Sequence, residues 1–74
     1  ITIYVDSTGK VFLDNQAVSL NKLFTIVRAK LAENSGAPVI IKADKSVMLN
    51  NAVRVMDVVK AAGGDRLVLA TEKD

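Results

Sequence analysis

Apolar and polar residues alternate in two short segments at the start of the chain. Residues 1–6 alternate between apolar and polar types, and residues 10–14 form a second strand-like run. Alternation is the period of a half-buried strand. Gly9 lies between the two runs and can supply the positive φ that a tight hairpin turn requires. We expect an antiparallel hairpin here, with a further turn at Asn15-Gln16 that leads out through Ala17-Val18.

Two later segments carry apolar residues at helical spacing. The first predicted helix has Ser19 as its N-cap, ends at residues 34–36, and cannot continue through Pro38. The second runs from about Leu49 to Ala62 and ends at the Gly63-Gly64 pair. The residues expected to face the core are Leu20, Leu23, Phe24, Val27 and Leu31 in the first helix, and Ala52, Val55, Met56 and Val59 in the second.

Residues 39–43 and 66–71 complete the pattern as two more strands. The first of them is almost continuously apolar, which is typical of a central strand. The predicted order is therefore ββαβαβ. Right-handed crossovers would place both helices on one face of a mixed sheet. We predict an α+β fold, a two-layer sandwich formed by one domain that spans residues 1–74.

The amino-acid composition limits the chemical reactions and ligands that the chain could support. The chain has no cysteine and no histidine, so it lacks thiolate ligands and the commonest general base and metal ligand. Its ten basic and eight acidic residues are spread evenly, without the clusters typical of a nucleic-acid surface. The serines fit caps and turns, and no neighbouring base would activate them. We therefore expect no enzyme activity, no cofactor or metal, and no nucleic-acid partner.

The segment Ala43-Asp44-Lys45-Ser46-Val47 closes the third predicted strand and leads into the second helix. Taken alone, Asp44 is explained as a loop residue whose carboxylate accepts nearby backbone amides. A functional interpretation arises from the sequence around it. Three blocks, residues 39–47, 54–63 and 67–73, follow the order strand, Ala-Asp-Lys, helix with Val-Met-Asp, Ala-Gly, and strand with Thr-Glu.

In this order and spacing the chain resembles the ExbD/TolR family over essentially its whole length. The Ala43-Asp44-Lys45 segment and the ending at residues 69–73 are more similar to ExbD-type than to TolR-type members. The resemblance implies the periplasmic domain of a dimeric bacterial inner-membrane protein with one transmembrane helix. Such proteins work with a channel partner, ExbB or TolQ, and use the proton gradient to energise TonB or TolA. The chain starts inside a strand-like pattern, so we expect a domain excised from a longer, membrane-anchored protein whose proton-carrying residue lies elsewhere.

A domain without catalytic groups would act through its surfaces. The last strand is a candidate edge strand, and such an edge offers unpaired amides and carbonyls to an extended segment. We expect Leu67 and Leu69 to alternate into the core, with Val68 and Ala70 on the other face. The segment recruited would belong to a second copy or to a TonB-like partner. The candidate partner-binding residues are Asp44, Lys45, Leu67, Val68, Leu69, Ala70 and Thr71.

Two alternatives stay open. The chain could be a TolR-type component of the Tol-Pal envelope-integrity system. It could also be a small-molecule-binding α/β domain, since two-layer domains of this size often bind ligands; a polar-lined cavity would favour that interpretation.

Overall fold

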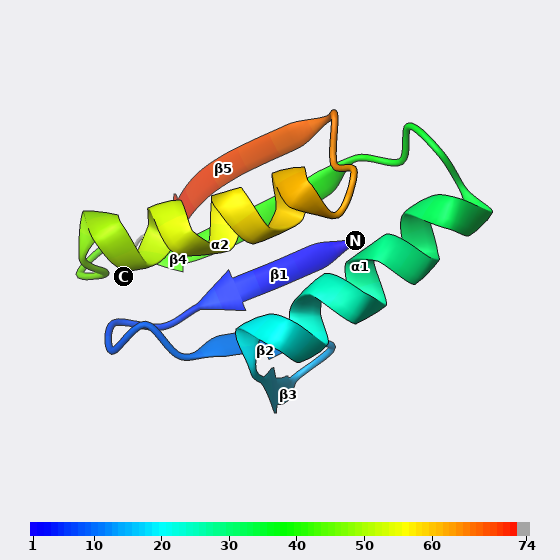
Figure 1. Cartoon of the computed structure of the whole chain (residues 1–74). Coiled ribbons are helices and arrows are strands. Elements are labelled where there is room, and N and C mark those ends of the chain that lie inside the picture. The colour runs from blue at the N-terminus through cyan, green and yellow to red at the C-terminus, as the bar shows by residue number, and fades with distance from the viewer. Residues whose placement is uncertain (73–74) are drawn as a thin grey trace.

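The computed structural model describes residues 1–72, which form one five-stranded sheet and two helices (Figure 1). Lys73 and Asp74, the end of the third family-like block and of the chain, lie outside the described residues. The elements in chain order are β1 (Thr2–Val5), β2 (Val11–Leu13), β3 (Gln16–Val18), α1 (Leu20–Glu33), β4 (Val39–Asp44), α2 (Leu49–Ala61) and β5 (Leu67–Glu72).

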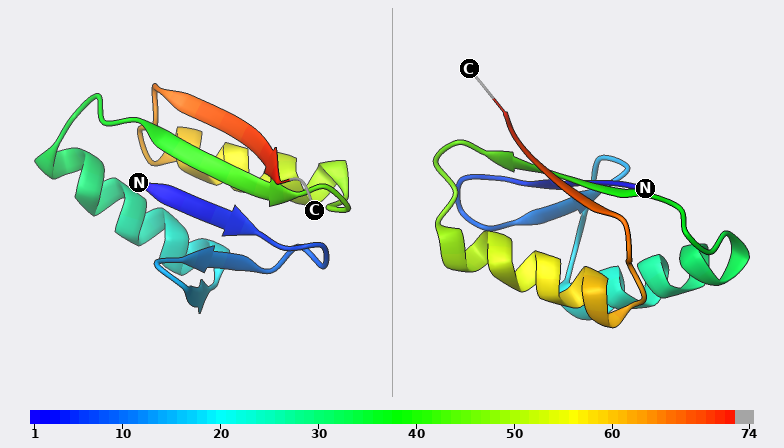
Figure 2. Two further views of the ribbon diagram at one scale, coloured as in Figure 1. Left: turned by 180° about the vertical axis from the view of Figure 1, so that it is seen from behind. Right: turned by 90° about the horizontal axis from the view of Figure 1, so that it is seen from above.

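The sheet order is β3-β2-β1-β4-β5. The pairs β1–β2 and β2–β3 are antiparallel, whereas β1–β4 and β4–β5 are parallel. Both helices lie on the same side of the sheet, α2 nearest β4 and β5 and α1 nearest β1 and β2 (Figure 2). The predicted α+β class, the mixed sheet and the two-layer arrangement are confirmed. The predicted central place of residues 39–43 and the edge place of the last strand are also confirmed.

One strand is additional to the predicted order. The chain turns at Asp14 and Asn15, with φ values of 51° and 66°, and Gln16 already pairs with Leu13. Two successive residues of positive φ define a two-residue hairpin turn that matches the twist of the strands. The turn predicted at Asn15-Gln16 was therefore one residue too late, and residues 16–18 form β3 instead of a connection.

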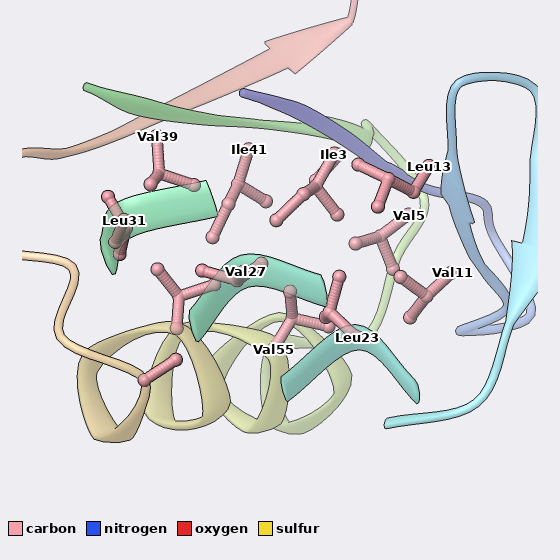
Figure 3. Close-up of a cluster of buried hydrophobic side chains, with 13 residues drawn as sticks. Ile3, Val5, Val11, Leu13, Leu23, Val27, Leu31, Val39, Ile41 and Val55 are labelled. Carbon is pink, nitrogen blue, oxygen red and sulfur yellow. The ribbon is translucent and has the colours of Figure 1, made fainter. Parts of the chain in front are cut away.

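The core lies between the sheet and the two helices (Figure 3). Ile3, Ile41 and Leu23 are completely buried in it, and among the described residues no polar or charged side chain is buried. Strand residues contribute from alternate positions, as the period of two requires. The core-facing residues predicted for the two helices are all buried or packed against the core, and Ile26 and Val58, which were not predicted, pack against it too. The predicted residues are Leu20, Leu23, Phe24, Val27, Leu31, Ala52, Val55, Met56 and Val59.

Local signals set the helix ends. The Lys22 backbone N–H donates to Ser19 Oγ at 3.1 Å, which confirms Ser19 as the N-cap of α1. At the end of α2, Gly63 has φ 104°, and the Gly64 N–H reaches back to the Val59 carbonyl at 2.9 Å. This backward bond is the Schellman arrangement. It turns the chain from α2 into the connection that places β5 beside β4.

Candidate partner-binding edge

β5 is an edge strand whose outer side is unpaired among the described residues, since its one neighbour in the sheet is β4. The Val39 N–H donates to the Arg66 carbonyl at 2.8 Å, and Val39 lies opposite Leu67 in the parallel register. The backbone groups of successive residues in a strand point in opposite directions, and every second residue points the same way. Since Arg66 faces β4, Val68 and Ala70 also turn their N–H groups toward β4. The N–H groups of Leu67, Leu69 and Thr71 then point outward. β5 thus presents a row of hydrogen-bonding groups to an incoming strand.

The side chains of β5 divide between the two faces of the sheet. Leu67 lies opposite buried Val39 and is partly buried against the core. Leu69 lies opposite buried Ile41, on the helix side, yet 46 % of it is exposed. The expectation that Leu69 belongs to the core is therefore wrong. An edge strand has a neighbour on one side alone, so one flank of this side chain is left open to solvent.

Among the described residues, the exposed large apolar side chains belong to β5 and to the start of α2. Two of them, Val68 and Leu69, belong to β5, and the others lie at the start of α2. Val68 lies on the sheet face without helices, and the others lie on the helix side, where they form what we term the apolar margin: Met48, Leu49, Val53 and Leu69. Isolated exposed apolar residues are ordinary, whereas a contiguous group of them marks an interaction surface.

The helix geometry explains why the α2 residues belong to the same margin as β5. Leu49 and Val53 are four residues apart and share one stripe of the helix. Asn51 stands between them on nearly the opposite side, since residues two apart differ by about 200°. The Asn51 side chain lies at the β1–β2 loop: a Cβ added to Gly9 would come within 2.5 Å of its Nδ2 atom. The loop is on the β1 side of α2, so Leu49 and Val53 face the β5 side.

Met48 occupies the N-cap position of α2 and makes no side-chain capping hydrogen bond. Ser, Thr, Asp or Asn at such a position would stabilise the helix by about 1 kcal/mol relative to an apolar residue. Met48 is instead 64 % exposed. Helix stability does not explain an exposed methionine there, but a contact with another molecule would. Sequence reasoning missed Met48, Leu49 and Val53, although apolar residues outside the core stripe of the predicted helix were the signal for them.

Asp44 and Lys45 lie at the end of β4, beside the end of β5. The register pairs Ala43 with Thr71 and Asp44 with Glu72. The Asp44 carboxylate accepts the Ser46 N–H at 2.8 Å, which confirms its predicted local role in the loop. Lys45 is exposed and starts the turn toward α2. The structure therefore places the seven sequence-predicted residues on β5, at the end of neighbouring β4 and in the turn that follows β4. Their role in partner binding stays a prediction.

The described residues contain no group of His, Cys, Asp and Glu side chains arranged to hold a metal ion. Within the same part of the chain, neither helix has the length and apolar character needed to cross a membrane. The chemistry at the β5 edge is thus that of a strand edge flanked by aliphatic side chains. Such an edge can pair with an extended polypeptide and cover its side chains on the helix side.

Comparison with known proteins identifies the family of the chain. The profile of the family described as Biopolymer transport protein ExbD/TolR matches residues 1–74, and the chain belongs to this family. It is similar to a putative biopolymer transport protein ExbD of Synechocystis sp., with 25% identity over 93% of this chain and 26% of the relative. It is also similar to the Biopolymer transport protein exbD2 of Vibrio cholerae, with 26% identity over 99% of this chain and 54% of the relative. The chain thus spans about a quarter and about half of the lengths of these two relatives.

Proposed function

We propose that this chain is a periplasmic protein-interaction domain of an ExbB–ExbD–TonB type complex, anchored in the bacterial inner membrane by a segment outside it. The complex would use the proton-motive force to drive transport across the outer membrane. Membership of a biopolymer-transport family supports the general role. The ExbD-type names of both relatives favour this system over the TolR-type alternative. We assign the chain no catalytic reaction and no cofactor.

The observation that carries the proposal is the apolar margin beside an open strand edge. β5 offers outward N–H groups at Leu67, Leu69 and Thr71, and Leu49 and Val53 flank it on the helix side. An extended segment of a TonB- or TolA-like partner would add to β5 as a sixth strand. Its helix-side residues would cover Leu69 and Val53. The same edge of a second copy could occupy this position in a homodimer, and partner and second copy would then compete for β5.

The channel partner, of ExbB or TolQ type, would contact the membrane-anchored part of the full protein. We therefore place no ExbB-like contact on the described residues. A small-molecule-binding role has some support in a hollow of about 530 Å³ on the face of the sheet without helices. The exposed large apolar residues all lie elsewhere, so protein binding is the better-supported role.

The direct test is a titration of the ¹⁵N-labelled chain with a peptide from the periplasmic linker of its TonB- or TolA-type partner, followed by NMR. We expect shifts at residues 67–71, at the 44–47 loop and at the start of α2. Leu69→Pro should abolish the shifts because it removes an outward N–H while leaving the β4 ladder intact. Leu69→Ala is the matched control, since it removes the same side chain but keeps the N–H. Shifts confined to α1, or equal binding by both variants, would contradict the proposal.

A further inference from the structure

The face of the sheet that carries no helix contains a hollow at the β1–β2 end, away from β5. Its volume is about 530 Å³, within the range of sites that hold a small ligand or one long side chain. The residues that line it come from β1, β2 and the following turn: Thr2, Tyr4, Phe12, Asp14 and Asn15.

The register of the hairpin builds this hollow. Tyr4 and Phe12 are partners in the antiparallel pair, and their ring centroids lie 6.2 Å apart with the ring planes inclined by 47°. Thr2 stands two residues before Tyr4 on the same face of β1, and Asp14, the first residue of the turn after β2, also lines the hollow. Asn15 follows Asp14 in the turn. An aromatic pair therefore lies next to a carboxylate, a hydroxyl and an amide.

The charge of the lining selects among ligands. Asp14 is its one charged residue, so the hollow offers negative charge in a chain whose net charge is +2. A guanidinium group stacks on aromatic faces and donates two parallel hydrogen bonds to a carboxylate. A neutral ring or sugar could use the aromatic faces but would form no charge-assisted pair with the exposed Asp14 carboxylate. We propose that this hollow binds an arginine side chain presented by a partner protein.

The neighbouring basic residue is compatible with this placement. Lys42 is the β4 partner of Tyr4 and is exposed on the same face. It lies across Tyr4 from Phe12, because β1 stands between β4 and β2 in the sheet. The entering guanidinium would sit at Asp14, which follows β2, and β1 would lie between it and Lys42 on β4. This site is independent of the β5 edge, so failure of either assignment leaves the other intact.

The chain itself supplies a specific probe. It has one tyrosine and no tryptophan, so tyrosine fluorescence reports on Tyr4 alone. We would titrate the chain with N-acetyl-arginine methylamide and, as a neutral match, with N-acetyl-citrulline methylamide, following fluorescence and ¹⁵N shifts. The expected result is a saturable change for the arginine probe, centred on Tyr4, Phe12 and Asp14. The citrulline probe should bind about tenfold more weakly or worse, since it lacks the charge-assisted hydrogen bonds.

Two variants complete the test. Asp14→Asn removes the charge and keeps the turn, because asparagine tolerates the positive φ found there; it should weaken arginine binding about tenfold. Asp57→Asn on the outer face of α2 changes net charge equally and should leave binding unchanged. Equal binding of both probes, or an unchanged affinity in Asp14→Asn, would overturn the proposal in favour of a neutral ligand. No saturable change with the arginine probe would overturn it as well.

Discussion

The two edges of the sheet are built in opposite ways. β3 has three residues, follows a two-residue turn, and exposes Gln16 and Ala17. β5 has six residues and exposes Val68 and Leu69, one on each face. Short edge strands resist accidental pairing with other chains, whereas long apolar ones invite it. The difference indicates that β3 ends the sheet and resists further strand pairing, whereas β5 is available to pair with a strand of a specific partner.

The two helices repeat the contrast. α1 begins at a capping serine, Ser19, and none of its large apolar residues is exposed. α2 begins at Met48 without a side-chain cap and exposes Leu49 and Val53 on the side next to β5. The helix on the β3 side thus has a side-chain cap and no exposed large apolar residue, whereas the helix on the β5 side lacks the cap and exposes such residues. Binding residues are expected where such local rules are broken.

The largest expected effect separates two leucines of the helices. Leu23 on α1 is completely buried and Leu49 on α2 is 77 % exposed. Leu23→Ala should lower the free energy of unfolding by about 2–5 kcal/mol, and Leu49→Ala should change it by less than about 0.5 kcal/mol. Urea denaturation of both variants measures this. For the affinity for the partner peptide the order should be reversed, with the larger loss in Leu49→Ala, since this variant removes part of the apolar margin. A strongly destabilised Leu49→Ala variant would mean that Leu49 serves the fold.

A smaller effect separates the two helix starts. Ser19→Ala should destabilise the chain by about 1 kcal/mol through loss of its hydrogen bond to the Lys22 N–H. Met48→Ser should stabilise the chain by about 0.5–1 kcal/mol by providing a cap. It should also weaken binding of the partner peptide. Thermal unfolding and the peptide titration together test this pair. A Met48→Ser variant that binds normally would remove Met48 from the interface.

The smallest effect concerns the polar turn that holds the β1–β2 hairpin. The hydrogen bond from the Thr8 hydroxyl lowers the pKa of Asp6, and the N–H groups of Lys10 and Thr8 and the charge of Lys10 act in the same direction. A lowered pKa in the folded chain stabilises it above pH about 4, the ordinary value of the unfolded carboxyl. This contribution is lost as the pH falls through the lower, folded-state pKa.

The measurement is stability against pH for the chain and for Asp6→Asn. Between pH about 5 and 2, the acid loss of stability should be smaller in the variant, because it has no carboxylate to protonate at this turn. Asp57→Asn, on an exposed helix face, serves as the control for removing one acidic residue. If both variants lost stability as the unmodified chain does, the Asp6 turn would not contribute.

The class of fold followed from residue patterns because its long elements have strong periods. β3 was missed since three residues carry too short a pattern, and its turn uses Asp14 and Asn15 at positive φ without a glycine. Leu69 was assigned to the core from alternation alone, which gives the face of a strand but not its cover at an edge. The edge position of the last strand was predicted correctly, whereas the partner-binding role of the seven candidate residues stays a prediction. The α2 residues of the apolar margin could not be predicted from the sequence pattern, because their membership depends on how α2 packs beside β5.

Hydrogen exchange of the β5 amides, with and without the partner peptide, tests the central claim most directly. In the free chain the amides of Val68 and Ala70, which face β4, should exchange slowly, and those of Leu69 and Thr71 should exchange fast. The account predicts that bound peptide slows Leu69 and Thr71 and leaves the β3 edge unchanged. Protection that appears along β3, or Leu69 and Thr71 amides that stay fast in the saturated complex, would contradict it.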